Sequence, residues 1–329
     1  MRLLTAADIE RAVSMADAIA AVKHAFAELS AGRASVPVRA SLAADAHHGT
    51  ALYMPAYLAA SQSLGIKAVT VFPGNPERGL PTIFAAVLLQ DATTGRPAAL
   101  LEGTYLTALR TGAATGAATE LLARPDASRL CLFGTGGQAP CQLEGVCAVR
   151  RLEEVWVWSR NSDHARHFIE RMRHRPFAHE IMFHLTTNPR DGVRRADIIV
   201  TATPARRPLF TADGVREGTH VNAIGAFMPE MIEVPKALVA RAKVVVDSRE
   251  ACLAEAGDLL RPIQDGLIAP THIYAELGEL VAGQKPGRTS ATEITFFKSV
   301  GNAVQDLAVG RLALERAEAE GFGYVVELG

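Results

Sequence analysis

The first third of the chain combines an amphipathic helical segment with a group of strands. From residue 5 to 31, apolar residues recur at spacings of three and four, and Thr5 can cap a helix at its start. From Ala51 to Leu89, the apolar runs LYMPAYL, LGIKAVTVF and TIFAAVLLQD are separated by SQS and by the turn-rich PGNPERGLP. This pattern predicts an amphipathic helix followed by antiparallel strands joined by hairpins.

A helix crowded with small residues is predicted from Glu102 to Arg124, and Pro125 ends it. Its alanines and glycines, among them Gly112, are dense enough to let another backbone or a ligand approach closely. Arg110 is the unusual residue, because a long cation interrupts a segment of Ala, Gly and Thr. Either it serves a binding site or it faces solvent.

After residue 128 the pattern changes to alternating strands and helices. Apolar strands are predicted at RLCLF, EVWVWS, ADIIVTATP, THVNAIG and KVVVD, and helices at APCQLEGVCAVR and NSDHARHFIERMRH. Continuous apolar strands in this alternation are typical of a parallel sheet covered on both faces. A final helix, roughly Val300 to Glu320, is expected to pack back on the first domain.

These patterns predict the α/β class with two domains. The length agrees, since 329 residues are enough for about two hydrophobic cores. The expected boundaries assign residues 1–118 and 300–329 to one domain and residues 119–299 to the other.

Composition argues against several classes of partner and site. Lys and Arg number 34 and Asp and Glu 35, so the formal charge of -1 provides no field to collect nucleic acid or anionic lipid. Charged residues within the first twenty positions interrupt any signal peptide, and we expect a cytoplasmic protein without a membrane partner. The cysteines fit no zinc motif, so free thiols and no metal site are expected at Cys131, Cys141, Cys147 and Cys252.

A glycine-rich turn, GTGGQ, follows the strand RLCLF and opens a helix. In a dinucleotide-binding fold, Gly134 would permit the tight turn, and Gly136 would let the backbone approach a pyrophosphate at the helix N-terminus. Gly137 and Gln138 complete the turn, and Ala139 takes the place of the third small residue. The alternative is a glycine turn without a ligand. The context on both sides, with a second strand about 20 residues later, favours a Rossmann dinucleotide-binding domain.

The second strand ends in Trp158-Ser159-Arg160-Asn161, without the acidic residue by which NAD enzymes usually bind the ribose 2′-hydroxyl. The hydroxyl of Ser159 and the guanidinium of Arg160 suit a 2′-phosphate instead. NADP(H) is therefore the preferred cofactor, with NAD(H) as the other candidate. The alternative is that Arg160 only faces solvent.

Ten segments spread over nearly the whole chain form one set. They are MPAY, GIKAVTVFPGN, GLPT, LLEGTYLTALRTGAATG, GTGGQAPCQ, ADIIVTATP, THVNAIGAF, VVVDSREACLAEAGDL, AELGELVAGQKPGRTS and EITFFKSVGNAVQDL. Together and in this order, they resemble the ornithine cyclodeaminase and mu-crystallin family of dehydrogenases and deaminases. The resemblance implies a homodimer in which a Rossmann domain is inserted in an α+β domain for substrate binding and dimerisation.

The same resemblance implies particular site residues. Arg39, Lys67 and Arg110 would hold the substrate carboxylate, and Val300 would lie beside the substrate. The other implied contacts are with the cofactor: Thr82, Arg110, Thr111, Thr201, Thr203, Val221, Asn222, Ala223, Ile224 and Ser299.

Two positions depart from the family pattern. Ile83 and Phe84 follow GLPT where members often have His-Gln, which puts a polar contact there in question. Phe227 stands where ornithine cyclodeaminases carry a catalytic aspartate, and its phenyl ring neither accepts nor donates a proton.

Lys67 stands out without the resemblance. It lies in the run from Leu64 to Phe72, whose two faces are otherwise largely apolar, and burying an ammonium group without a partner is costly. Either it reaches the edge of the sheet or it serves a site. If Arg39 and Arg110 lie nearby, as the resemblance implies, the pKa of Lys67 would fall, which suits a catalytic proton donor at the reacting nitrogen.

We therefore expect an NAD(P)H-dependent reductase of a small 2-imino acid, with a cyclic ketimine such as Δ1-pyrroline-2-carboxylate preferred, or the reverse amino acid dehydrogenase. In that chemistry the cofactor supplies hydride and the protein orients the carboxylate. Two alternatives stay open. One is an ornithine cyclodeaminase, a lyase that recycles NAD in place, and the other is a crystallin-like protein that binds NADPH and a hormone-like acid without useful turnover.

Overall fold

The computed structural model describes residues 1–327, which divide into two compact units. The first unit contains Met1–Arg110 and the chain from Asn302 onward, and the second contains Thr111–Gly301. The sequence analysis placed the boundaries at 118/119 and 299/300, whereas the first division falls within the helix α3 (Gly103–Leu122). A continuous helix provides no linker signal in the sequence at such a point.

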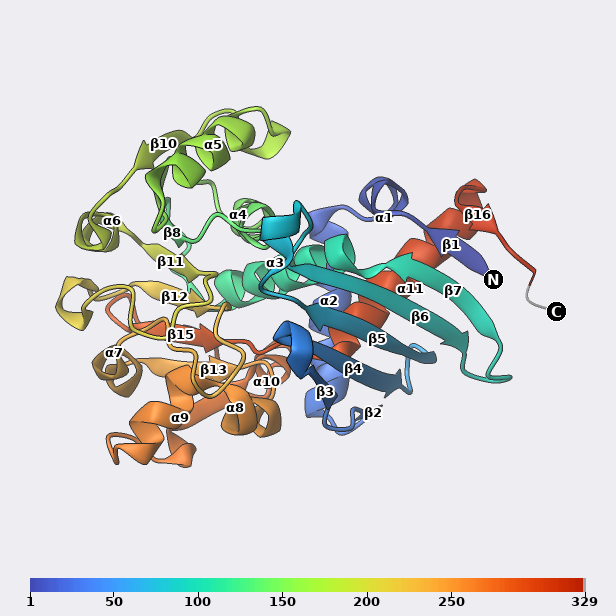
Figure 1. The fold of residues 1–329 in the computed structure, drawn as a ribbon. Coiled ribbons are helices and arrows are strands. Elements are labelled where there is room, and N and C mark those ends of the chain that lie inside the picture. Colours follow the sequence, from blue (N-terminus) through green and yellow to red (C-terminus); the bar gives the residue numbers. More distant parts are fainter. Residues whose placement is uncertain (328–329) are drawn as a thin grey trace. The chain divides into compact units, whose positions relative to one another are not determined.

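The first unit is built on one mostly antiparallel sheet (Figure 1). The strand order is β16-β1-β7-β6-β5-β4-β2, and β3 also pairs with β4. The strands are β1 (Arg2–Leu4), β2 (Ala34–Ser35), β3 (Ala40–Ala44), β4 (Gly49–Leu58), β5 (Ser63–Val71), β6 (Ile83–Asp91), β7 (Pro97–Glu102) and β16 (Tyr324–Val325). The strands β4, β5 and β6 pair as antiparallel neighbours, which confirms the predicted hairpins, and β7 adds an antiparallel strand that was not predicted.

Three helices complete the first unit: α1 (Ala6–Ala12), α2 (Met15–Ser30) and α11 (Ala303–Glu320). The helical segment predicted from residue 5 to 31, with Thr5 as its cap, is confirmed, but it is divided into two helices. The chain adopts an extended conformation at Val13, and the Ser14 side chain accepts a hydrogen bond from the Asp17 amide to start α2. The predicted final helix is confirmed as α11, which packs against α2 and against β4, β5 and β6.

The second unit is a parallel sheet with helices on both faces (Figure 1). Its order is β10-β9-β8-β11-β12-β15-β13-β14, and every pairing is parallel. The strands are β8 (Arg129–Phe133), β9 (Glu154–Trp158), β10 (Met182–Leu185), β11 (Ile198–Thr201), β12 (His220–Ala223), β13 (Lys243–Val246), β14 (Ile273–Glu276) and β15 (Thr295–Lys298). The helices are α4 (Ala139–Cys147), α5 (Ser162–Arg173), α6 (Pro189–Arg195), α7 (Lys236–Arg241), α8 (Arg249–Glu255), α9 (Gly257–Gln264) and α10 (Leu277–Val281).

The core of the second unit lies in two apolar layers, one on each face of the sheet. Leu130 and Leu132 of β8 belong to one layer, and Cys131 and Phe133 belong to the other. The prediction that these strands are buried on both faces is confirmed. The strand order around β8 is that of a Rossmann fold. Within residues 1–327, no helix is long and apolar enough to cross a membrane.

The helices α3 and α4 approach each other closely at two glycines. A Cβ atom at Gly112 would lie 2.2 Å from the carbonyl oxygen of Cys141, and one at Gly145 would lie 2.1 Å from the carbonyl oxygen of Gly112. Neither position has room for a larger residue. The small residues of α3 therefore permit the close backbone approach that the sequence predicted.

Candidate functional site

A buried carboxylate bridges two cations in the first unit. Lys67 Nζ on β5 lies 2.7 Å from Asp306 Oδ2, and Arg110 Nε lies 3.0 Å from Asp306 Oδ1. The three residues are 2%, 5% and 0% exposed in the order Lys67, Arg110, Asp306. Sequence reasoning brought Lys67 and Arg110 together correctly, and it missed Asp306, which gives the buried lysine its counter-charge.

The start of α11 positions this cluster. Arg110 Nη1 donates to Gln305 Oε1 at 2.8 Å, and Gln305 Nε2 donates back to the Arg110 carbonyl oxygen at 3.3 Å. The amide of Asn302 also donates to Gln305 Oε1 at 2.9 Å as part of the helix cap. Arg110 Nη2 donates no hydrogen bond among the described residues, so this part of the guanidinium can bind a ligand.

The surroundings of Lys67 lower its pKa below the value in water, and so they favour the neutral amine. Burial lowers its pKa to about 8, Arg110 lowers it as well, and Asp306 opposes both. Arg39, a partly buried residue just before β3, lowers the pKa further and so lies within electrostatic range of Lys67. The expected lowering by two guanidiniums is found, although burial is the larger cause.

Asp306 had a signal in the sequence that was not used. It occupies a position of α11 among buried small and apolar residues, including Ala303, Leu307 and Gly310. A carboxylate on the apolar face of a helix requires a buried partner. Together with the buried lysine of β5, it was a recognisable candidate for an ion pair.

The glycine turn of the second unit leaves open space at its centre. Gly134 has φ 101°, and a Cβ atom there would lie 2.4 Å from the carbonyl oxygen of Ala202. A Cβ atom at Gly136 or Gly137 would meet nothing within 4 Å. The backbone before α4 is therefore accessible to a ligand, and this fits a dinucleotide pyrophosphate.

The end of β9 lies beside this turn. The amide of Gly134 donates to the carbonyl oxygen of Trp158 at 3.0 Å. Ser159 is partly exposed and Arg160 is exposed directly after that strand. Both side chains thus stand at the edge where a dinucleotide fold binds the ribose of its cofactor.

Glu233 joins the carboxyl ends of β11 and β12. Its Oε1 accepts hydrogen bonds from the amide and the hydroxyl of Thr203, each at 2.7 Å. Its Oε2 accepts from the Thr201 hydroxyl at 3.0 Å and from the amides of Gly225 and Ala226 at 2.7 and 3.0 Å. Burial raises the pKa of Glu233, and these five donors stabilise the carboxylate form. The hydroxyls of Thr201 and Thr203 are therefore engaged within the protein.

An ion pair connects the same region to β15. Lys298 Nζ, which is fully buried, lies 3.1 Å from Asp258 Oδ2 and donates to the Ala223 carbonyl oxygen at 3.1 Å. Asp258 Oδ1 accepts from the amides of Glu233 and Val234 at 2.8 and 3.1 Å. Two carboxylates and one ammonium group thus hold together the carboxyl ends of β11, β12 and β15 and the start of α9. They belong to Glu233, Asp258 and Lys298.

Asp247 orders the turn that follows β15. Its Oδ2 accepts from the Ser299 hydroxyl at 2.7 Å and from the amides of Val300 and Gly301, each at 2.9 Å. Its Oδ1 accepts from the Ser248 amide at 2.8 Å. Ser299 and Val300, predicted to line the site, are therefore held in one conformation.

Among the other predicted cofactor residues, Asn222 of β12 has a side chain that is already hydrogen-bonded within the protein. Asn222 donates to the Thr119 hydroxyl at 3.1 Å, and its Oδ1 lies 3.1 Å from His220 Nε2. Burial lowers the pKa of His220 to about 3, so the ring is neutral and structural. Because the side chains of Asn222 and His220 are hydrogen-bonded within the protein, mainly the backbone of β12 remains for contact with a ligand. The rest are buried or partly buried: Thr82, Thr111, Val221, Ala223 and Ile224.

Phe227 packs against the apolar core of the second unit. It lies in the segment after Gly225 and Ala226, whose amides are held by Glu233. Its ring supplies no proton-transfer group at a position where ornithine cyclodeaminases are expected to have one.

A family model agrees with this architecture. The model of the ornithine cyclodeaminase/mu-crystallin family matches residues 1–321. The chain is also 42% identical over 328 residues to a Δ1-pyrroline-2-carboxylate reductase of Bacillus cereus, with 99% of this chain and 100% of the relative covered.

Solved structures agree over the same length. The structure of Thermococcus litoralis Δ1-pyrroline-2-carboxylate reductase in complex with NADH and L-proline has a TM-score of 0.94, at 42% identity, over 99% of this chain and 100% of that one. An archaeal alanine dehydrogenase dimer with bound NAD has a TM-score of 0.92, at 36% identity, over 100% of this chain and 99% of that one. The chain therefore belongs to the ornithine cyclodeaminase/mu-crystallin family.

Proposed function

We propose that this protein is an NAD(P)H-dependent reductase of small cyclic 2-imino acids such as Δ1-pyrroline-2-carboxylate, with the amino acid dehydrogenase reaction as its reverse. The observation that carries the proposal is the buried Lys67–Asp306–Arg110 cluster. Lys67 and Arg110 share one carboxylate, and this excess positive charge, with Arg39 in electrostatic range of Lys67, suits a substrate carboxylate. The activities of the two reductases and of the alanine dehydrogenase above support the same class.

Each residue of the cluster has a distinct role in this proposal. Arg39 and the free Nη2 group of Arg110 bind the substrate carboxylate. Lys67 donates a proton to the imine nitrogen, and Asp306 positions the Lys67 ammonium group. A reduced nicotinamide supplies the hydride to the imine carbon when it is bound. Hydride and proton together convert the C=N bond to an amine.

The cofactor contacts form the second part of the proposal. The open backbone at Gly134, Gly136, Gly137 and Gln138 binds the pyrophosphate. Ser159 and Arg160 select NADP(H), and the ordered strand ends next to Glu233 and Asp247 support the nicotinamide side. The further proposed contacts are Thr82, Thr111, Thr201, Thr203, Val221, Asn222, Ala223, Ile224 and Ser299, with Val300 toward the substrate. A cytoplasmic location stays a prediction.

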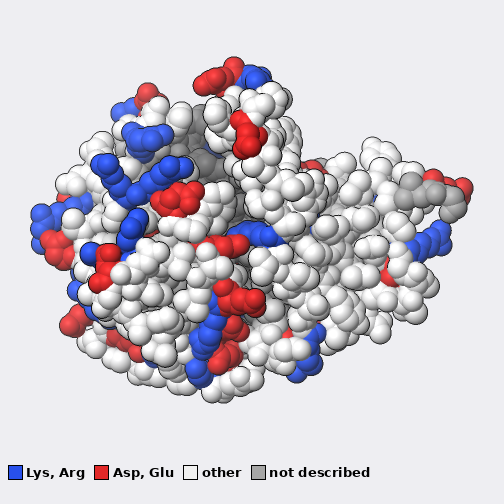
Figure 2. All heavy atoms as spheres, turned by 60° about the horizontal axis from the view of Figure 1, so that its bottom comes forward, with Lys and Arg blue, Asp and Glu red and all other residues white. Residues whose placement is uncertain are grey.

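The outer face of the first sheet is proposed as the contact with a second copy of this chain. The inner face packs against α2 and α11. On the outer face, Ile66, Leu88 and Leu100 stand opposite one another across β5, β6 and β7. Tyr53 and Leu100 are each 38% exposed, and the first unit is largely uncharged on the side seen in Figure 2. An exposed apolar face of this kind marks an interaction surface, and the archaeal alanine dehydrogenase above is a dimer.

An assay with purified protein tests the reaction. We expect Δ1-pyrroline-2-carboxylate to be reduced to proline with consumption of NADPH, measured at 340 nm. Ornithine with catalytic NAD should release negligible ammonia, because Phe227 cannot transfer a proton. Ammonia release from ornithine above about 1 s⁻¹ would instead establish a cyclodeaminase, and tight NADPH binding without turnover of any imino acid would favour the binding protein.

Cofactor choice is tested at Arg160. One charge-assisted contact to the 2′-phosphate should make NADPH better than NADH in kcat/KM by about ten- to a hundredfold. Arg160→Ala should remove most of that ratio and leave the NADH value nearly unchanged. Arg166→Ala, on the exposed surface of α5, is the matched control. An unchanged ratio in Arg160→Ala would contradict the assignment.

The role of Lys67 is tested by the pH dependence of kcat. Lys67 with a pKa of about 8 is mostly protonated at lower pH, so proton donation should be lost as the pH rises through about 8. Lys67→Met should lower kcat by about 10² to 10⁴-fold and abolish this alkaline limb. Asp306 raises the pKa of Lys67, so in Asp306→Asn the limb should move to lower pH. Full kcat in a folded Lys67→Met variant would exclude Lys67 as the proton donor.

The dimer face is tested by one charge. Leu100→Asp places a carboxylate in the middle of the apolar row and should convert a dimer to monomers in sedimentation velocity at micromolar concentration, because a charge there would be buried without a partner. Leu267→Asp introduces the same change at a residue of the second unit that is 47% exposed, and it should stay dimeric. A dimeric Leu100→Asp variant would place the interface elsewhere.

A further inference from the structure

An arginine-rich recess lies at the amino edge of the parallel sheet in the second unit. Its volume is about 690 Å³, in the range of small-molecule sites. The lining comes from the end of α3 and the segment after it, from the segment between α4 and β9, and from the loop before β15: Glu120, Leu121, Ala123, Arg124, Pro125, Asp126, Arg150, Arg288, Thr289, Ser290 and Ala291. The glycine turn follows the opposite, carboxyl end of β8, so the proposed cofactor residues do not form this recess.

Within residues 1–327, two of its arginines donate no hydrogen bond to a carboxylate. Arg150 donates to the carbonyl oxygens of Thr119, Glu120, Ala123, Arg124 and Val149. Arg288 donates to the carbonyl oxygens of Leu122, Thr219, Ser290 and Glu293 and to the Thr295 hydroxyl. All these acceptors are neutral, so neither guanidinium has a carboxylate in direct contact, and Glu120 and Asp126 of the same lining attract Arg150 only from a longer distance.

The end of α3 does not neutralise these charges. A helix C-terminus carries about half a negative charge, against two guanidinium groups. Burial lowers the pKa of Arg288, Glu293 raises it, and Arg124 and Arg150 lower it again, which shows that the guanidiniums repel one another. Arginine remains protonated in such surroundings, so the repulsion persists at neutral pH.

Arg124 adds a third cation with part of its donor capacity free. Its Nε donates to Asp126 Oδ1 at 3.1 Å, and its Nη2 donates to Asp197 Oδ1 at 3.0 Å. Asp197 also pairs with Arg129 and Arg216. The side chain of Asp126 is 78% exposed, so water screens its charge. Arg124 Nη1 makes no hydrogen bond within the described part of the chain.

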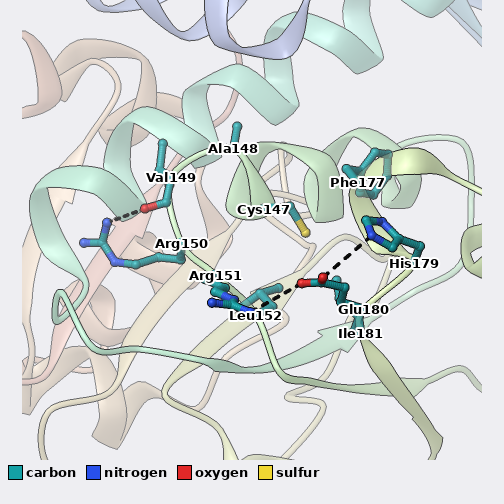
Figure 3. A pocket seen from close by; sticks show the side chains of 10 residues that line it. All are labelled: Cys147, Ala148, Val149, Arg150, Arg151, Leu152, Phe177, His179, Glu180 and Ile181. Atoms are coloured by element: carbon teal, nitrogen blue, oxygen red, sulfur yellow. Dashed lines mark hydrogen bonds and ion pairs between the residues drawn. The ribbon is translucent and has the colours of Figure 1, made fainter.

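A neighbouring recess shows the contrasting arrangement. Figure 3 shows Arg150 pointing away from it, with a bond to the Val149 carbonyl oxygen, whereas Arg151 and His179 point toward Glu180. Arg151 lies 3.5 Å and His179 lies 3.8 Å from that carboxylate. The charged groups that point into this neighbouring recess compensate one another, whereas the first recess has three arginines against Glu120 and Asp126, an excess of one positive charge.

We propose that the recess lined by Arg124, Arg150 and Arg288 is a binding site for a small dianionic oxyanion of the phosphate type. Arg124 Nη1 contacts the anion, and the exposed hydroxyls of Thr289 and Ser290 exchange their present bonds to Glu293 and Thr292 for it. Arg150 and Arg288 contribute charge without direct contact. Free phosphate and a phosphomonoester share this chemistry. The proposal is independent of the proposed reaction.

The test is a calorimetric titration of the NADPH-saturated protein at constant ionic strength, with inorganic phosphate in one arm and glycerol 3-phosphate in the other. Bound NADPH prevents phosphate from occupying the glycine turn. We expect one saturable site per chain with a Kd in the millimolar range. A tighter Kd for the ester identifies a phosphorylated metabolite as the ligand, and equal values identify free phosphate. Absence of saturable binding in both arms overturns the proposal.

Two variants locate the site. Ser290→Asp should weaken binding about tenfold or more, because it adds a negative charge at the rim while keeping an acceptor for the Thr292 amide. Arg124→Gln should weaken binding about threefold to tenfold. Arg151→Gln, the matched control in the neighbouring recess, should stay within twofold of the wild type. Unchanged affinity in Ser290→Asp would assign the bound phosphate to another place, such as the Lys67 cluster, and would overturn the proposal.

Discussion

Asp306 is the constraint on which the first unit depends. An ammonium group on a central strand can be buried only if a counter-charge is buried with it. Asp306 supplies that charge to Lys67 and shares it with Arg110, so strand β5, helix α3 and helix α11 are joined at one carboxylate. The same contact keeps the pKa of Lys67 from falling further, because Asp306 opposes the effects of burial and of Arg110. Fold stability and proton chemistry therefore depend on one geometry.

In the second unit, buried carboxylates accept hydrogen bonds from backbone amides. Glu233, Asp258 and Asp247 are buried at or after the carboxyl ends of the strands, and each accepts at least two amide hydrogen bonds. Among the described residues, Lys298 is the one buried ammonium group that pairs with any of them, namely with Asp258. Segments after parallel strands have no ladder partners of their own, so these carboxylates take the place of the missing hydrogen bonds. The result is a rigid edge to the sheet at the place where nucleotides bind in such folds.

Local patterns were sufficient for much of this architecture. The hairpins from β4 to β6, the glycine turn before α4 and the small residues of α3 were all recognisable, because each depends on residues close in sequence. The break at Ser14 was missed because apolar spacing continues across it, while the cap that starts α2 depends on one hydroxyl. Asp306 was missed because its partner lies 239 positions earlier, at Lys67, and spacing arguments do not connect such distant residues. The network around Glu233 was missed for the same reason.

The place of the last strand and the last helix also affects how the chain is made. β15 is the final strand of its sheet in sequence, yet it lies between β12 and β13 and pairs with both. α11 follows directly and brings Asp306 to Lys67. During synthesis from the N-terminus, neither unit can reach its native form until β15 and α11 have left the ribosome. Until then the sheet of the first unit exposes an uncompensated lysine on its inner face, and the parallel sheet lacks the strand that joins its two parts.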